Sequence, residues 1–212
     1  MKRLASLMLV LIAAILVTGV AAPARADMKP TAGAAAPAAI DSLALLEKAV
    51  ARDSSKFDNL YRLGILYLDR ERMAEAAQVF QKANQLRPKN VKVLVNLGVA
   101  LDAVGKADEA QRWYQRALDV APGDSVAMCR LASSKYAQGK YDEAMTMLRK
   151  LIHDQPGAHC AYFTMGVAFA DAGIYRDAIR MWHKVIELSP NSPEAQSAKE
   201  SIDVLEKFLQ GK

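Results

Sequence analysis

The chain has 212 residues, of which 52% are hydrophobic and 24% charged, and its formal net charge is +5. Three of the positive charges, on Lys2, Arg3 and Arg25, lie within positions 1–26, which contain no acid, so the remainder carries only +2. Because the basic balance comes mainly from this N-terminal segment, it argues against a nucleic-acid partner.

The N-terminal segment has the pattern of a secretory signal peptide. Two basic residues precede an apolar run over residues 4–20, and the segment ends Ala24-Arg25-Ala26, with small residues at the two places that a signal peptidase reads. We expect residues 1–26 to be removed by cleavage after Ala26, which predicts a periplasmic or secreted protein. The alternative is an uncleaved N-terminal membrane anchor, since 17 apolar residues are at the short edge of a membrane span.

Two short segments precede the main body of the chain. Residues 27–39 are rich in alanine and proline and have little to bury, which predicts a flexible linker. Residues 40–56 contain a helical apolar pattern that aligns with the second helix of the repeats described next, Ala49 matching Ala83. This segment is predicted to be an N-terminal half-repeat that covers the first full repeat.

A regular 34-residue period runs through most of the remaining chain. It places a proline and an alanine at fixed points of each period: Pro88, Pro122, Pro156 and Pro190, and Ala76, Ala110, Ala144 and Ala178. Each period holds two stretches with helical apolar spacing, of the kind seen over 59–69 and 73–85. One such hairpin cannot bury its own apolar face, so neighbouring hairpins must stack.

The residues that carry the period resemble the signature of the tetratricopeptide repeat family: Leu60, Leu63, Gly64, Tyr67, Ala76, Phe80 and Pro88. The resemblance implies an all-α fold, a right-handed superhelical solenoid of stacked helix-turn-helix repeats. It divides the chain into repeats at 57–90, 91–124, 125–158 and 159–192, followed by a C-terminal capping helix over 193–212.

Small and large residues have separate places in this scheme. Gly64 and Ala76 are predicted to be small because the two helices of a repeat approach closely there, while Tyr67 and Phe80 fill the neighbouring space. The third repeat departs from the pattern. Its alanine and lysine replace the glycine and the large residue, and we expect Tyr136 to take the space that Lys135 leaves.

The same resemblance implies that the first helices line a concave groove, which is where a tetratricopeptide protein binds its partner. Residues predicted to face this groove are Tyr61, Arg62, Ile65, Leu68, Lys92, Val95, Asn96, Val99, Arg130, Tyr136, Phe163, Val167 and Asp171. Many are apolar, where an ordinary surface helix would be polar, and exposed apolar surface usually marks a contact site. The alternative is that about half of them simply pack against adjacent helices.

One subfamily grips the C-terminal carboxylate of its partner with a clamp of lysine, asparagine and arginine. Asn96 and Arg130 match two places of that clamp, but Tyr61, Ile65 and Val126 stand where its other residues are needed. The clamp is incomplete, so that ligand is not predicted.

Cys129 and Cys160 are the only cysteines, and both are assigned to the groove side of neighbouring first helices. In an oxidising compartment they could form a disulfide, although adjacent helices must come unusually close for that. The sequence leaves a disulfide and two small buried thiols both open.

No catalytic site, metal site or cofactor is predicted. The three histidines lack metal-ligand spacing, and no serine or cysteine has the setting of an activated nucleophile. The function that remains is a non-catalytic scaffold or adaptor of the cell envelope that binds a protein or peptide segment, with no small-molecule substrate. The alternative is a periplasmic assembly chaperone that holds apolar segments of exported clients.

Overall fold

The computed structural model describes residues 42–211. The predicted signal peptide (1–26), the predicted linker (27–39) and the start of the predicted half-repeat helix lie outside the described residues, so their expectations remain predictions.

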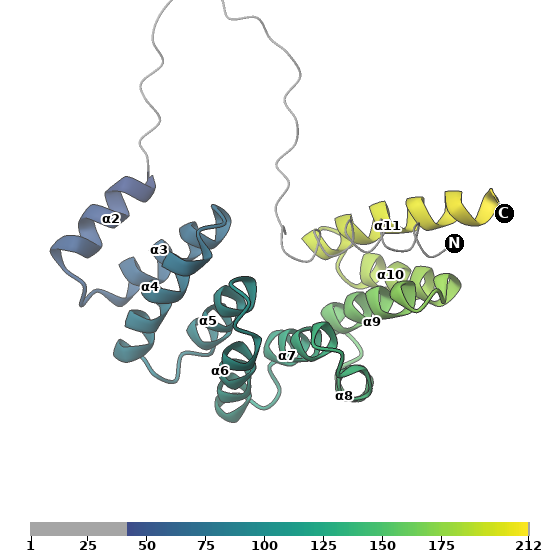
Figure 1. Ribbon diagram of the computed structural model, residues 1–212, viewed down its shortest axis with the longest axis horizontal. Coiled ribbons are helices and arrows are strands. Elements are labelled where there is room, and N and C mark those ends of the chain that lie inside the picture. The colour runs from purple at the N-terminus through teal and green to yellow at the C-terminus, as the bar shows by residue number, and fades with distance from the viewer. Residues whose placement is uncertain (1–41, 212) are drawn as a thin grey trace, which may run out of the picture.

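The described residues form helices and turns, with no strand among them. The helices are α2 (Ser42–Arg52), α3 (Phe57–Asp69), α4 (Met73–Leu86), α5 (Val91–Ala103), α6 (Ala107–Val120), α7 (Ser125–Ala137), α8 (Tyr141–Asp154), α9 (His159–Asp171), α10 (Tyr175–Leu188) and α11 (Pro193–Gln210). They follow one another along an arch from α2 to α11 (Figure 1). Each predicted repeat holds one first helix (α3, α5, α7, α9) and one second helix (α4, α6, α8, α10), so the chain is a helical solenoid.

Local sequence explains where several helices begin. Asn90, Asp124 and Ser192 each stand one residue before a helix and accept a hydrogen bond from the third backbone N–H beyond, at 3.1, 2.7 and 3.1 Å. These side chains satisfy donors that a helix start otherwise leaves unpaired. Pro193 follows at the first position of α11, where its missing N–H costs nothing.

The turn between the two helices of a repeat needs a left-handed residue. Gly105, Gly139 and Gly173 hold this place in the last three repeats, with φ of +79°, +79° and +76°. In the first repeat the same place is taken by Glu71, with φ of 58°, the one non-glycine residue at positive φ in the described part of the chain. A side chain there is strained, because its Cβ crowds the backbone.

Three of the four first helices contain a glycine that lies directly against an aromatic ring of the following helix. A Cβ atom added at Gly64 would lie 2.6 Å from the Phe80 ring, and Gly98 and Gly166 face the rings of Tyr114 and Trp182 in the same way. The glycine therefore makes room for an aromatic ring, in agreement with the predicted place of Phe80 in the space beside Gly64. All three rings are almost completely buried.

The third repeat solves the same packing problem with other residues. Ala132 replaces the glycine and Leu148 replaces the aromatic ring, and both are fully buried in one cluster with Leu151. The ammonium group of Lys135 lies 2.6 Å from the carboxylate of Glu143. Tyr136 packs half-buried against the same cluster, and its filling of the space beside Lys135 stays a prediction.

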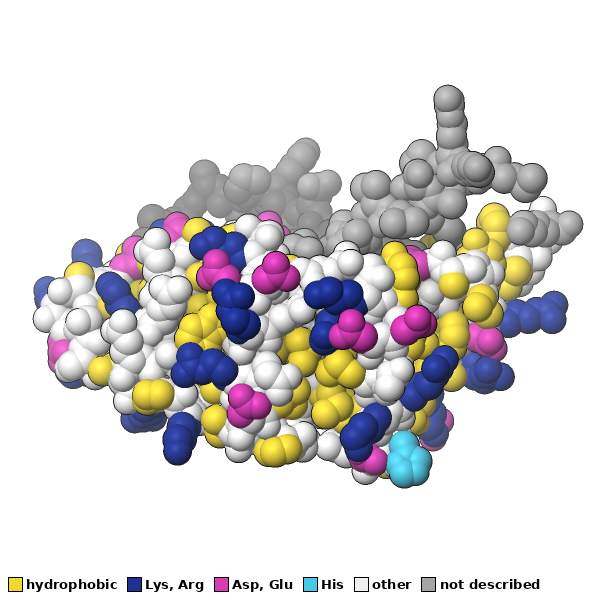
Figure 2. Space-filling view, turned by 60° about the horizontal axis from the view of Figure 1, so that its bottom comes forward, with side chains coloured by type: hydrophobic (Ala, Val, Ile, Leu, Met, Phe, Trp, Pro, Cys, Tyr) yellow, Lys and Arg dark blue, Asp and Glu magenta, His cyan; other side chains and the backbone are white. Residues whose placement is uncertain are grey.

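The two ends of the stack are covered by single helices. Helix α2 buries Leu43 against the first repeat, and α11 buries Ala195, Ala198, Ile202 and Leu205 against the fourth. On the outer face shown in Figure 2, positively and negatively charged side chains are interspersed with hydrophobic ones, and neither charge forms a large patch of its own.

Candidate partner-binding groove

A pocket of about 210 Å³ lies between successive first helices in the C-terminal half of the arch. The third repeat lines it with Ser125, Val126, Cys129, Arg130, Ser133, Gly157 and Ala158; the fourth with His159, Cys160, Phe163 and Thr164; and α11 with Pro193, Glu194 and Ser197. Its walls therefore come from three consecutive units of the stack.

The lining combines an apolar wall with polar groups. Phe163 and the Cys129–Cys160 disulfide supply the apolar part, while Arg130 and Glu194 carry opposite charges. Arg130 is exposed, and no hydrogen bond or ion pair from the described residues occupies its guanidinium group. Apolar walls with a few polar groups are what a pocket needs to hold one side chain of a bound segment in a fixed orientation.

The predicted groove residues fall into three classes of exposure. Arg62, Lys92, Arg130 and Asp171 are exposed, and Tyr61, Ile65, Leu68, Asn96, Val99, Tyr136 and Phe163 are half-buried. Val95 and Val167, by contrast, are only 6% and 5% exposed and belong to the core. Their prediction as partner-contacting residues is wrong, because neighbouring first helices pack closely enough to cover a side chain of this size.

The N-terminal half of this side is filled by its own aromatic residues. Phe57 and Tyr61 stack with centroids 6.1 Å apart, and Arg87 lies over the Phe57 ring at 3.9 Å. Asn96 donates to the Tyr61 hydroxyl at 3.5 Å. Tyr61 and Asn96 are therefore engaged with each other.

The seam between α7 and α9 is held by cross-links along its length. Cys129 and Cys160 form a disulfide at its N-terminal end, with Cα atoms 6.1 Å apart, which settles the choice that the sequence left open. Ser133 and Thr164 share a hydrogen bond of 3.3 Å midway, and at the far end the Tyr136 hydroxyl donates to Asp171 at 3.1 Å. Although Asp171 is exposed as a residue, partial desolvation of its carboxyl group in this seam raises its pKa, and the hydrogen bond from Tyr136 opposes that shift.

A second polar group, the half-buried Asp102, joins the second and third repeats. Asp102 accepts hydrogen bonds from the Ser134 hydroxyl at 2.9 Å and the Tyr114 hydroxyl at 3.0 Å. Burial raises the pKa of Asp102, and these hydrogen bonds and the charge of Arg130 partly offset the shift. Burial also raises the pKa of Tyr114. All three hydrogen-bonding groups are satisfied within the protein, so their role is to join repeats.

The contribution of α11 to the pocket was missed from the sequence. Glu194 and Ser197 stand one full repeat period after Cys160 and Phe163, so α11 continues the register of the first helices. The 34-residue spacing is the sequence signal for this pocket-lining role, which adds to the capping role predicted for the helix.

The described residues contain neither a candidate metal site nor a candidate membrane-spanning helix. No group of three or more histidine, cysteine or acidic side chains there could hold a metal ion. None of the helices within residues 42–211 combines the length and apolarity needed to cross a membrane.

The stacked two-helix hairpins, with a pocket between successive first helices, define an α-helical repeat protein of the kind that presents an extended surface. Family models described as "Tetratricopeptide repeat" match residues 67–133 and 135–202, and a further one matches 41–91. These matches cover more than half of the chain, which therefore belongs to the tetratricopeptide repeat family.

Solved structures of this fold resemble the chain along most of its length. The crystal structure of MamA is 24% identical, with a TM-score of 0.57, over 74% of this chain and 89% of that one. TTC0263 from Thermus thermophilus is 16% identical, with a TM-score of 0.64, over 76% and 88%. YrrB, described as "a TPR protein with an unusual peptide-binding site", is 28% identical, with a TM-score of 0.52, over 74% and 81%. No curated protein matches the chain.

Proposed function

We propose that this protein is a non-catalytic adaptor of the cell envelope that binds a segment of a partner protein along its first helices, with one side chain of the segment anchored in the pocket between α7, α9 and α11. The observation that carries the proposal is the pocket itself, which combines an exposed arginine, hydroxyl groups and an apolar wall. Family membership supports a protein-binding role, and the peptide-binding site described for YrrB supports a peptide as the ligand.

The extracytoplasmic setting rests on two independent features. Positions 1–26 have the pattern of a signal peptide. The Cys129–Cys160 disulfide is a bond that persists in oxidising compartments and is rare in reducing ones. Together they favour a periplasmic or secreted protein over a cytosolic one.

The test compares two arginine variants in a partner pull-down from envelope extract. Arg130→Ala removes the pocket arginine, whereas Arg149→Ala removes an exposed arginine of α8 that does not line the pocket. The double variant Arg130→Ala/Phe163→Ala should reduce recovery of the partner, whereas Arg149→Ala should not. The helical circular-dichroism signal should be the same in both. Equal recovery by both variants would refute binding at this pocket.

The same experiment separates an adaptor from a chaperone. An adaptor yields one stable partner. Recovery of many weakly held clients, all released by a competing apolar peptide, would instead favour the periplasmic assembly chaperone.

A further inference from the structure

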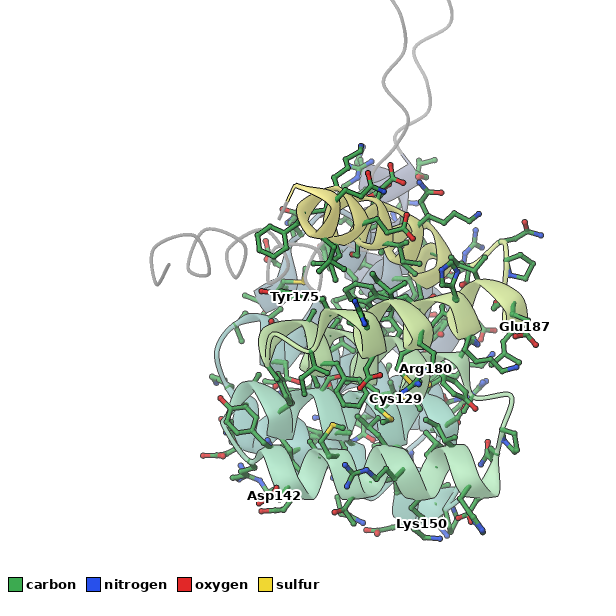
Figure 3. All side chains as sticks on the ribbon, turned by 90° about the vertical axis from the view of Figure 1, so that its right-hand side faces the viewer. Cys129, Asp142, Lys150, Tyr175, Arg180 and Glu187 are labelled. Atoms are coloured by element: carbon green, nitrogen blue, oxygen red, sulfur yellow. A yellow bond between two sulfur atoms is a disulfide. The ribbon has the colours of Figure 1, made fainter. Side chains whose placement is uncertain are left out.

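The Cys129–Cys160 disulfide lies in the wall of the pocket rather than in the closed core. Both cysteines line the pocket. Cys129 is only 5% exposed, but Cys160 is partly exposed. Figure 3 shows Cys129 within the outline of the stack, whereas Asp142 and Lys150 of α8 lie at its edge. We therefore expect a reagent small enough to enter the pocket to approach the bond from the side of Cys160, the more exposed of the two cysteines.

The disulfide joins α7 and α9 at the end of their seam that forms the pocket. Cys129 is the fifth residue of α7 and Cys160 the second of α9, so the disulfide ties the two helices at the N-terminal end of their seam. The other cross-links of this seam, Ser133–Thr164 and Tyr136–Asp171, lie further along both helices. If the disulfide opens, the end of the seam that forms the pocket loses its covalent tie.

The charges around the sulfur atoms favour exchange. Cys160 lies in the first turn of α9, where the helix dipole stabilises a negatively charged sulfur. The positive charge of Arg130 also lines the pocket, and Glu194 is the one carboxylate among the lining residues that could repel an incoming thiolate.

We propose that the Cys129–Cys160 disulfide is a thiol–disulfide exchange site reached through the pocket, and that its redox state controls binding of the partner segment. The co-reactant is a dithiol, either a small molecule or a pair of cysteines on another protein. The control of binding rests on the function proposed above, but the exchange reaction does not.

The reaction proceeds in two balanced steps. One thiolate of the dithiol attacks Cys160 Sγ, which forms a mixed disulfide and releases Cys129 as a thiolate that takes up a proton. The second thiolate of the dithiol then attacks the dithiol sulfur that is bonded to Cys160, which closes the oxidised dithiol and releases Cys160 as a thiolate that takes up the second proton. The protein gains two electrons and two protons, and the dithiol loses them.

The first experiment measures exchange alone, on the folded chain with dithiothreitol as the dithiol. Alkylation and mass spectrometry count the thiols released over time. We expect reduction without denaturant, slowed about tenfold or more in Ser197→Trp, whose ring blocks the pocket, because exchange rates depend on access to the sulfur. His183→Trp, at an exposed position of α10 outside the pocket, should react like the wild type. Reduction that requires unfolding, or equal rates in the two tryptophan variants, would overturn the exchange site.

The second experiment compares partner binding by the oxidised chain and by the reduced chain kept in excess dithiothreitol, with Cys129→Ser/Cys160→Ser as a permanently open control. We expect binding to weaken by at least about fivefold on reduction, the lower end of typical coupling between sites. Exchange with unchanged binding would overturn the control of binding. If the oxidised chain binds no partner while exchange still occurs, the proposed function fails and the exchange site stands.

Discussion

The pairing of a small residue with a ring can be tested in the second repeat. A Cβ atom at Gly98 would come well within 3.0 Å of three carbon atoms of the Tyr114 ring. That ring is 1% exposed, and its hydroxyl is anchored to Asp102 at 3.0 Å, so it has little freedom to move away. Overpacking of this kind costs about 1–3 kcal/mol. Alanine is a better helix former than glycine by about 1 kcal/mol, which offsets part of that cost.

The decisive comparison uses two backgrounds. In the wild type, Gly98→Ala should lower the free energy of unfolding by up to about 2 kcal/mol, the difference between the clash and the gain in helix propensity. In Tyr114→Leu, which recreates the Ala132–Leu148 pair of the third repeat, the clash is gone. There the same substitution should be neutral or stabilising, by up to about 1 kcal/mol.

Urea unfolding followed by circular dichroism gives the four free energies of this cycle. If Gly98 is a glycine in order to accommodate the Tyr114 ring, the coupling energy between positions 98 and 114 should be about 1–3 kcal/mol. The same effect of Gly98→Ala in both backgrounds would show that glycine is not there to seat the ring, and would refute the reasoning.

Three further predictions concern single features of the stack. Glu71→Gly should raise the free energy of unfolding by about 1 kcal/mol, because it removes a side chain from a residue at positive φ. Gly105→Glu should lower the free energy of unfolding by a similar amount. Equal stability of the two variants in urea melts would contradict the proposed backbone strain at these positions. Because burial raises the pKa of Asp102, its protonation stabilises the fold below the unfolded-state pKa and this contribution is lost as pH rises through the folded-state pKa. The free energy of unfolding of the wild type, relative to that of Asp102→Asn, should therefore be higher at about pH 3 than at pH 7. If the difference between the two proteins does not change with pH, the raised pKa of Asp102 is contradicted. Replacing both Cys129 and Cys160 by serine should cost about 4 kcal/mol, from the loop entropy of a sequence separation of 31, and an unchanged thermal melt would show that the bond contributes nothing to stability.

The 34-residue period was sufficient to predict the fold, because each repeat has small, large and turn-forming residues at the same positions. Pro88 and Gly105 mark helix and turn boundaries through backbone geometry, which depends little on the rest of the protein. The sequence predicts that Gly64 is small and that Phe80 fills space nearby, but it does not predict that the two face each other directly. Gly64 and Phe80 meet only when their two helices cross at a particular angle, and a linear pattern does not contain that angle.

The candidate site was predicted less completely than the fold. Arg130 and Phe163 were identified by their place in the repeat, and both line the pocket. Val95 and Val167 occupy places of the same kind, yet they are buried, because exposure depends on how closely neighbouring repeats pack. The Cys129–Cys160 bond could not be decided from the sequence, since it depends on a separation of a few ångströms between two helices.

The most direct test of the account is site-specific photo-crosslinking in cells. A photoreactive residue at Ser197, in the pocket wall, should form a crosslink to one partner polypeptide, and that crosslink should disappear when Arg130 and Phe163 are replaced by alanine. The same residue at Arg149 on α8 should form none. Crosslinks from position 149 with none from position 197 would show that the partner binds elsewhere on the solenoid, and the proposed groove would have to be abandoned.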